Sequence, residues 1–260
     1  MDAGIAAALI SSLAGVVVSV GASVWTHRQG VELERVRYEL ERSTRESEKR
    51  SAAKAELDRY REPLLVAAFE LGARIHNIRK NAFLAYLKST PRRRRLATLG
   101  TLFCVARYFG TLEILYSRLA LLRFESAADT RLVAALLADM GREFSTDSYD
   151  RIDTFHSSRF MLWREEQRAI GELMRGPDGQ AEQCAGFAYF DARYDEVFAP
   201  WLSGFAIALE SGAAPGSERL ARLQTLLALL VTQLDEEGAY TLTVDGETVA
   251  PDWVTAQGLA

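Results

Sequence analysis

The chain has little cysteine, histidine or proline. Its 260 residues contain two cysteines, three histidines and six prolines. The two cysteines, Cys104 and Cys184, are too few for a disulfide-stapled secreted domain and are typical of a reducing compartment. With 48% hydrophobic and 25% charged residues, the composition excludes a collagen-like or disordered chain and indicates an ordinary folded protein.

Motifs that carry chemistry are also missing. The sequence has no glycine-rich nucleotide loop, no H-E-x-x-H, no C-x-x-C and no nucleophile elbow. The histidines, His27, His76 and His156, lack a second ligand at helix spacing, so we expect no metal site. We therefore predict no catalytic residue and no cofactor, and we expect that the protein is not an enzyme.

Charged side chains are absent from residues 3–25. As a helix this run would measure about 35 Å, enough to cross a bilayer core of about 30 Å. Residues 1–25 contain no Lys or Arg, whereas residues 26–45 contain five arginines. The positive-inside rule then predicts a single span in the plasma membrane, with the N-terminus outside and the remainder cytoplasmic. The alternative, a cleaved signal peptide, lacks its basic start and its cleavage site.

Small residues recur every four positions along this run. They are Ala3, Ala7, Ser11, Gly15, Ser19 and Ser23. A stripe of small side chains lets two helices approach closely in lipid. We therefore predict a homo-oligomer that forms through Ser11, Gly15, Ser19 and Ser23. The alternative is a chance pattern in a run rich in alanine, glycine and serine.

The remaining chain is predicted to be mostly helical. From residue 31 to residue 62 it has neither Gly nor Pro, and Glu and Arg recur at helical spacing, which indicates a charged spacer helix. Pro63 is expected to start a new helix or to kink the chain. The further helices are expected at 64–87, 96–124, from a cap at Ser126 and Asp129 to Gly141, 158–174, 182–198, 201–210 and 220–234.

The clearest periodic segment is the last helix. Leucines at 220, 223, 227, 230 and 234 make an apolar stripe that faces a core. After it, Tyr240, Leu242 and Val244 alternate, and Asp245-Gly246 favours a two-residue hairpin turn. The predicted fold is all-α with a small C-terminal hairpin. Its parts are a transmembrane anchor (1–25), a stalk (26–62), a cytoplasmic helical domain (63–238), and a hairpin with its tail (239–260).

Charge is unevenly divided. Residues 71–112 contain nine basic and no acidic side chains, whereas residues 124–260 contain 23 acidic and 10 basic ones. Either the two regions attract one another, or the basic region meets an anionic partner. Arg92, Arg93, Arg94 and Arg95 are predicted on a loop after Pro91. If the chain reverses at Pro63, this loop returns to the bilayer and contacts anionic lipid. The acidic remainder disfavours nucleic acid.

Two polar stripes suggest a buried network. Arg164, Arg168 and Glu172 lie beside Gln167 on the helix of 158–174, and Glu70, Arg74, Asn77 and Asn81 share a face of the helix of 64–87. If these helices face one another, Arg74, Asn77, Arg164, Gln167, Arg168 and Glu172 could satisfy each other. A role in packing is the first interpretation, and a small-ligand or anion site is the second.

Two segments, 60–65 (YREPLL) and 163–174 (WREEQRAIGELM), resemble an uncharacterised actinobacterial family of single-pass, membrane-anchored helical proteins. The resemblance covers most of the chain and implies location and fold, without an activity. The sequence thus favours a membrane-tethered interaction or regulatory protein with an unknown protein partner. The alternative function is an oligomerising membrane effector that its cytoplasmic domain triggers.

Overall fold

The computed structural model describes residues 37–45, 47–48, 51, 55, 59–119, 128–147, 159–176 and 183–235, and in the tail 238, 240, 242–244, 247–249 and 252–255. The chain divides into two compact units, Met1–Ser51 and Ala52–Ala260. The predicted anchor, with Ser11, Gly15, Ser19 and Ser23, lies outside the described residues.

In the first unit, residues 37–45 are helical and all of their side chains are exposed. Glu41 and Arg45 form an (i, i+4) ion pair of 3.6 Å between solvated side chains. Such pairs add a few tenths of a kcal/mol each and support a solvent-exposed helix. This part of the stalk is therefore helical, as its glutamate and arginine spacing predicts.

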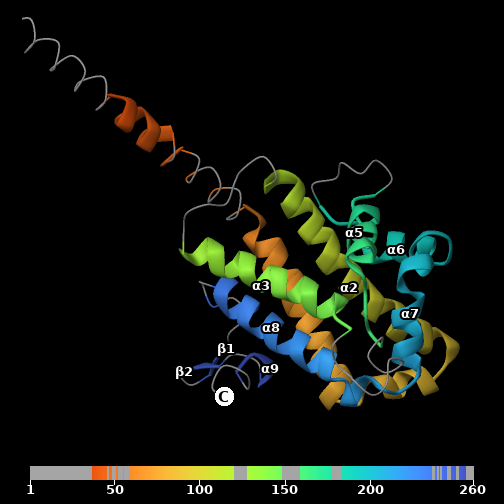
Figure 1. Ribbon diagram of the computed structural model, residues 1–260. Helices are drawn as coiled ribbons and strands as arrows, with labels where there is room; N and C mark the ends of the chain where they lie inside the picture. Colours follow the sequence, from red (N-terminus) through yellow and green to blue (C-terminus); the bar gives the residue numbers. More distant parts are fainter. Residues whose placement is uncertain are drawn as a thin grey trace, which may run out of the picture. The chain divides into compact units, whose positions relative to one another are not determined.

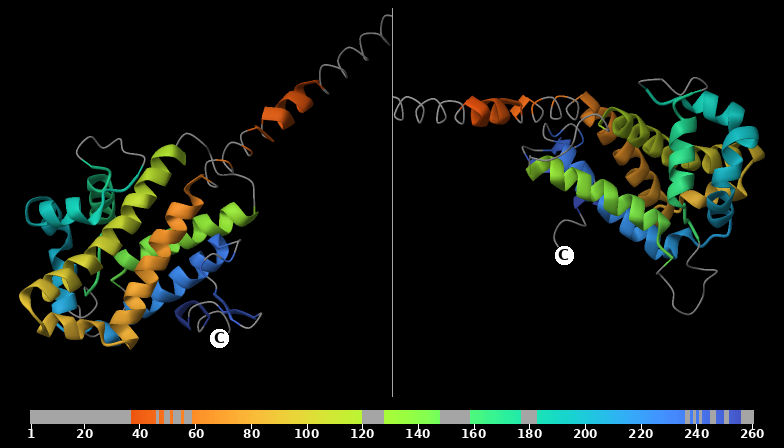
Figure 2. Two further views of the ribbon diagram at one scale, coloured as in Figure 1. Left: turned by 180° about the vertical axis from the view of Figure 1, so that it is seen from behind. Right: turned by 45° about the horizontal axis from the view of Figure 1, so that its top comes forward.

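Residues 59–80 form one helix that passes through Pro63 (Figures 1 and 2). The expected break at Pro63 is wrong, and the chain does not reverse there. Tyr60 and Leu64, one turn apart, are both buried, so the apolar face of the helix continues across the proline. The free energy gained by burying that apolar face offsets the loss of the backbone hydrogen bond that proline cannot donate.

The reversal comes later, after residue 80. Ala82 has a positive φ of 51°, and a 3₁₀ helix, η1 (Phe83–Lys88), follows it. Helix α2 (Pro91–Leu119) then begins at Pro91, five residues before the predicted start at Leu96. Proline suits a first helical position, and the backbone N–H of Arg93 donates to Thr90 Oγ1 at 3.4 Å.

Other helix ends also differ from the predictions. The remaining helical elements are α3 (Ala128–Ser145), α5 (Arg164–Leu173), α6 (Phe187–Arg193), the π-helical turn η2 (Tyr194–Phe198), α7 (Ala199–Glu210), η3 (Ala214–Gly216) and α8 (Glu218–Leu234). Helix α3 continues four residues past Gly141. Helix α5 starts six residues later than expected, where Glu166 Oε2 accepts the backbone N–H of Trp163 at 2.7 Å. Pro200 lies inside α7, directly after the π-helical turn.

The core forms where α2 packs on α5 and α3 packs on α8. Figures 1 and 2 show α3 and α8 side by side. All five leucines of the predicted stripe on α8 are buried, which confirms that this face packs into the core. Cys104 is also buried in the core, as a small apolar residue would be.

The tail contributes to the same unit. Strands β1 (Leu242–Val244) and β2 (Glu247–Val249) pair antiparallel, with Leu242 opposite Val249. The predicted turn at 245–246 lies outside the described residues, so the hairpin as a whole stays a prediction. Helix α9 (Asp252–Thr255) places Trp253 against Gly72, where any Cβ would collide with the indole ring.

The described residues are mostly helical, which confirms the all-α class. Among them, one helix is long and apolar enough to cross a membrane by length and composition, Pro91–Ser117 within α2. Most of its apolar stretch is buried inside the domain, as in the core helix of a soluble protein. The charge-free run of residues 3–25 is a separate segment, and its span stays a prediction.

Candidate functional site

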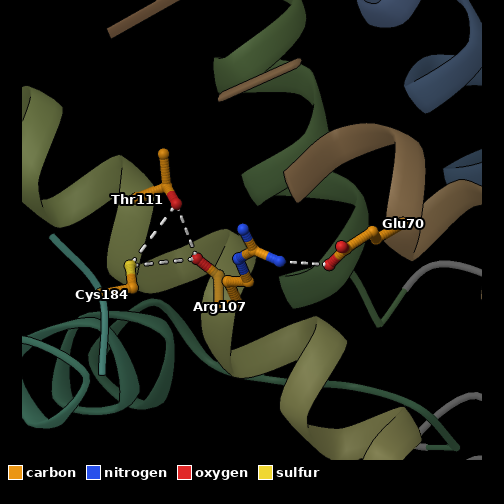
Figure 3. Close-up of polar contacts among 4 residues, drawn as sticks. All are labelled: Glu70, Arg107, Thr111 and Cys184. Atoms are coloured by element: carbon orange, nitrogen blue, oxygen red, sulfur yellow. Dashed lines mark hydrogen bonds and ion pairs between the residues drawn. The ribbon is translucent and has the colours of Figure 1, made fainter. Parts of the chain in front are cut away.

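Three segments meet around the middle of α2. Arg107 and Thr111 lie one turn apart on α2, Glu70 comes from the helix of 59–80, and Cys184 comes from the loop before α6 (Figure 3). The sequence analysis did not connect the three segments, because Glu70 and Cys184 lie 37 and 77 positions from Arg107 along the chain.

Arg107 and Glu70 form a direct ion pair. Arg107 Nη1 donates to Glu70 Oε2 at 2.6 Å, and the two side chains are 31% and 41% exposed. A pair with this much solvent access contributes about 1 kcal/mol or less to stability. It does, however, orient the guanidinium and leaves it with further N–H donors.

Cys184 and Thr111 share the backbone carbonyl of Arg107. Thr111 Oγ1 donates to this oxygen at 2.9 Å, Cys184 Sγ lies 3.6 Å from it, and the two side chains are 3.5 Å apart (Figure 3). Burial raises the pKa of the Cys184 thiol, which a hydrogen bond with Thr111 lowers only in part. A protonated thiol is a poor nucleophile.

Two glycines let the neighbouring segments approach α2. A Cβ at Gly110 would lie 2.6 Å from Met174 Cβ and 2.8 Å from Cys184 Sγ. A Cβ at Gly171 would lie 2.8 Å from the carbonyl oxygen of Phe109. The loop that carries Cys184 is held further by the backbone N–H of Ala185, which donates to Met174 O at 2.8 Å. Cys184 is therefore held against α2 by the close approach at Gly110 and by the bond of its neighbour Ala185 to the end of α5.

Arg107, Thr111 and Cys184 line a cavity of about 320 Å³, which we call the Arg107 cavity. Its lining residues are Tyr60, Glu62, Pro63, Val66, Arg107, Thr111, Ile114, Gln183 and Cys184. Tyr60 is only 4% exposed, and its buried hydroxyl has no hydrogen-bond partner among the described residues. The volume of the Arg107 cavity is at the lower end of the roughly 300–1,000 Å³ typical of small-molecule sites.

The predicted polar network does not form between the two helices that were expected to face each other. Arg74 lies over the ring of Phe83 at 4.4 Å, and Asn77 accepts a hydrogen bond from Asn81 at 2.8 Å. Arg164 donates to the carbonyl of Ala138 at 3.2 Å. Arg168 and Glu172 are exposed on α5.

Gln167 is the one buried member of that predicted set. Its Nε2 donates to the carbonyl oxygens of Gly141 at 2.9 Å and Leu162 at 2.8 Å. The side chain thus joins α5 to the end of α3 and to the loop before α5. These contacts between packed segments agree with packing specificity, the first interpretation of the polar stripe.

The four arginines Arg92–Arg95 lie in the first turns of α2 and not on a loop. Arg94 pairs with Glu210 at 3.2 Å, and Arg95 pairs with Asp191 at 2.9 Å. Both partners belong to the acidic region, so attraction between the two regions accounts for part of the charge asymmetry. Because the chain does not reverse at Pro63, the geometric reason for lipid contact at these arginines no longer holds.

The sequence analysis missed Arg219, a buried cation at the start of α8. Its guanidinium donates to the carbonyl oxygens of Glu143 at 2.5 Å, Phe144 at 3.1 Å, Thr146 at 2.6 Å and Arg159 at 3.1 Å. Burial lowers the pKa of Arg219 to about 10, so the group stays charged at neutral pH. It satisfies carbonyls at the C-terminal end of α3, where a positive charge is favoured.

Comparison of the chain with protein-family models, curated proteins and solved structures finds no match. The resemblance to an actinobacterial family of anchored helical proteins therefore stays a prediction from residues 60–65 and 163–174.

Proposed function

We propose that this chain is a membrane-tethered interaction or regulatory protein whose Ala52–Ala260 unit binds its partner in the cytoplasm. The observation that carries the proposal is the charge-free run of residues 3–25, followed by five arginines within residues 26–45. The exposed, charged helix of residues 37–45 suits a spacer between an anchor and a folded unit.

Features of the folded unit support binding over chemistry. The Arg107 cavity contains a thiol whose pKa burial raises, next to an arginine already paired with a carboxylate. No histidine lines this cavity in the described part of the chain. The site can therefore hold a ligand or respond to one more readily than it can activate a nucleophile.

Reporter fusions test the location. A reporter active only in the cytoplasm, fused after Ala260, should be active, and one active only outside the membrane should be silent. Deleting residues 1–25 should move the protein from the membrane fraction to the soluble fraction. Activity of the external reporter, or membrane retention of the deletion variant at high salt, would contradict the proposal. Toxicity on overexpression that depends on residues 1–25 would favour the alternative, a membrane effector.

A further inference from the structure

One end of the Ala52–Ala260 unit carries positive charge that the fold does not use. The helix of 59–80 ends there, η1 follows it, and α2 begins there (Figures 1 and 2). Residues 80–96 contain six basic and no acidic side chains. Two of the six, Arg94 and Arg95, pair with acidic side chains of α7 and α6. The other four are exposed and have no ion pair within the described residues: Lys80, Lys88, Arg92 and Arg93.

The four arginines divide between two sides of α2. With 3.6 residues per turn, Arg92 and Arg93 share the side of Leu96, whereas Arg94 and Arg95 turn toward α7 and α6. Cations near the start of a helix are disfavoured by the helix dipole. Carboxylates of the chain itself offset this cost at Arg94 and Arg95. At Arg92 and Arg93 no described carboxylate does so, and the missing counter-charge can come from a partner.

Exposed apolar side chains accompany the unpaired cations. Tyr86 on η1 is 50% exposed, and Leu96 on α2 is 48% exposed. Leu96 lies one helical turn from both Arg92 and Arg93. We call the surface formed by Tyr86, Lys88, Arg92, Arg93 and Leu96 the basic end. Tyrosine and arginine are enriched where proteins bind one another. The basic end therefore suits a ligand that carries carboxylates next to apolar side chains.

A narrow ligand complements this surface better than a wide one. Asp195, whose side chain is 79% exposed, lies 3.9 Å from Arg95 Nη2, and the side chain of Glu196 is 78% exposed. A bilayer or a nucleic-acid duplex that covered the start of α2 would meet these carboxylates within a Debye length of about 10 Å. A single peptide segment can contact Arg92 and Arg93 and avoid them.

The course of the chain also disfavours lipid. The helix of 59–80 places its two ends about 33 Å apart, at 1.5 Å per residue. The basic end follows residue 80, whereas the stalk precedes residue 59. The stalk therefore does not bring the basic end to a bilayer, and a protein in solution is the better match.

We propose that the basic end binds an acidic segment of a partner protein, in which carboxylates alternate with apolar side chains. Arg92 and Arg93 pair with its carboxylates, as Arg94 and Arg95 pair with those of the chain itself. Leu96 and Tyr86 contact its apolar side chains. Ion pairs at an exposed surface are individually weak, so this binding depends on salt. The inference rests on the proposed function, an interaction protein, and adds the surface and the chemistry of the partner.

The probe is a short fluorescein-labelled peptide in which glutamate is interspersed with leucine and phenylalanine. Its binding to the full chain in mild nonionic detergent is followed by fluorescence anisotropy. We expect binding at an ionic strength of about 0.1 M and its loss near 1 M, because the Debye length falls from about 10 Å to about 3 Å. The same peptide with glutamine in place of glutamate should not bind.

A pair of double variants tests the charges. Arg92→Gln with Arg93→Gln should weaken binding of the acidic peptide about five- to tenfold, because it deletes two exposed ion pairs. Arg131→Gln with Arg168→Gln is the matched control, since it removes the same charge from exposed positions on α3 and α5. The control should leave the affinity unchanged.

A second pair of variants tests the apolar contact. Leu96→Ser should weaken peptide binding about two- to fivefold, because less apolar surface is buried. Leu132→Ser on α3 is the matched control, since Leu132 is also 48% exposed, and it should have no effect. Circular dichroism checks that each variant is folded, and the arginine variants alone decide the test if Leu96→Ser is not.

Several outcomes would overturn the proposal. One is that the acidic peptide does not bind at low salt, and another is that the two arginine double variants weaken it equally. A third is that a labelled DNA duplex binds more tightly than the peptide and depends on Arg92 and Arg93. A fourth is that the arginine variant changes the size of the protein in detergent without peptide, which would assign the basic end to a second copy of the chain.

The membrane alternative has its own measurement. The full chain is placed in nanodiscs of phosphatidylcholine or phosphatidylglycerol, and acylation of Lys88 is followed by mass spectrometry. We expect equal acylation in both lipids. Protection of Lys88 by phosphatidylglycerol would assign the basic end to anionic lipid and overturn the proposal. None of these results depends on the reporter fusions, so failure here and failure of the proposed function are distinguishable.

Discussion

The two arginines Arg107 and Arg219 show opposite uses of the same side chain. Arg219 is 2% exposed and donates to four backbone carbonyls at the junction of α3 and α8. Arg107 is partly exposed, forms one ion pair within the described part of the chain and borders a cavity of about 320 Å³. The difference distinguishes a cation that holds the fold together from one with donors left for a ligand.

Burial explains why the two sites differ. At Arg219 every buried carbonyl needs a donor, because water is excluded and an unpaired oxygen is costly. At Arg107 solvent reaches the pair, so its hydrogen bonds can be exchanged for those of a ligand at little cost. Stability should therefore depend on the first site and ligand binding on the second.

The largest expected effect separates the two arginines directly. Arg219→Met should cost about 3 kcal/mol of folding free energy, since it leaves several backbone carbonyls without a donor. Arg107→Met should cost about 1 kcal/mol or less. Thermal unfolding followed by circular dichroism measures both, and equal losses would show that Arg219 does not hold the α3–α8 junction as described.

A second pair of variants tests the close packing beside Arg107. Gly110→Ala should destabilise the fold by about 1–3 kcal/mol, because the new methyl group collides with Met174 and Cys184. Gly204→Ala is the matched control on α7, where an added Cβ meets nothing within 4 Å. There the substitution should stabilise the fold by about 0.5–1 kcal/mol.

The reactivity of the Cys184 thiol gives an independent measurement on the same two variants, Gly110→Ala and Gly204→Ala. Displacement of its loop in Gly110→Ala should make the thiol react faster with an aromatic disulfide reagent, while the buried Cys104 serves as an internal reference. A change in folding stability of the same sign for Gly110→Ala and Gly204→Ala would contradict the close approach at Gly110.

The smallest expected effect is a pH dependence of the folding stability that arises from Glu143, next to Arg219. Burial raises the pKa of Glu143 in the folded state, although Arg222 and Arg219 lower it in part, and its Oε1 has no hydrogen-bond partner among the residues that the structure describes. Because the folded pKa exceeds the unfolded value, the folded state resists ionisation. Stability should therefore fall as pH rises from about 4.5 through the folded pKa.

Glu143→Gln should remove this dependence. The variant should melt at a slightly higher temperature than the natural chain at pH 7, and the difference should shrink as the pH falls below about 4, where the carboxyl becomes protonated in both states. Thermal midpoints across this pH range measure the effect. A variant that is less stable than the natural chain at pH 7 would show instead that the negative charge supports Arg219.

Sequence patterns predicted elements well where one face is strongly periodic. The leucines of α8 repeat at helix spacing, and burial of one face follows from that repeat alone. Helix ends were predicted poorly at Pro63, Pro91, Gly141 and Pro200, where each residue was taken as a break. A helix can begin with a proline, as α2 does at Pro91. It can also contain Pro200 after a π-helical turn and Gly141 packed against Arg164.

The sites were harder to predict than the elements. The four arginines after Pro91 stand out in the sequence, yet two of them pair with acidic residues of α6 and α7. The Arg107 cavity and the Arg219 contacts have no local signal, because their members come from distant segments. A single buried arginine at the start of an amphipathic helix looks the same in sequence as an exposed one.

The sequence by itself determined the helical class, the buried face of α8 and the charge-free run at residues 3–25, because periodicity and hydropathy act over neighbouring residues. Only the tertiary structure decided that the helix passes Pro63, which carbonyls Arg219 satisfies, and that Tyr60, Arg107 and Cys184 share one cavity. Those outcomes depend on packing between segments far apart in the chain, where burial of apolar surface outweighs local preferences by several kcal/mol.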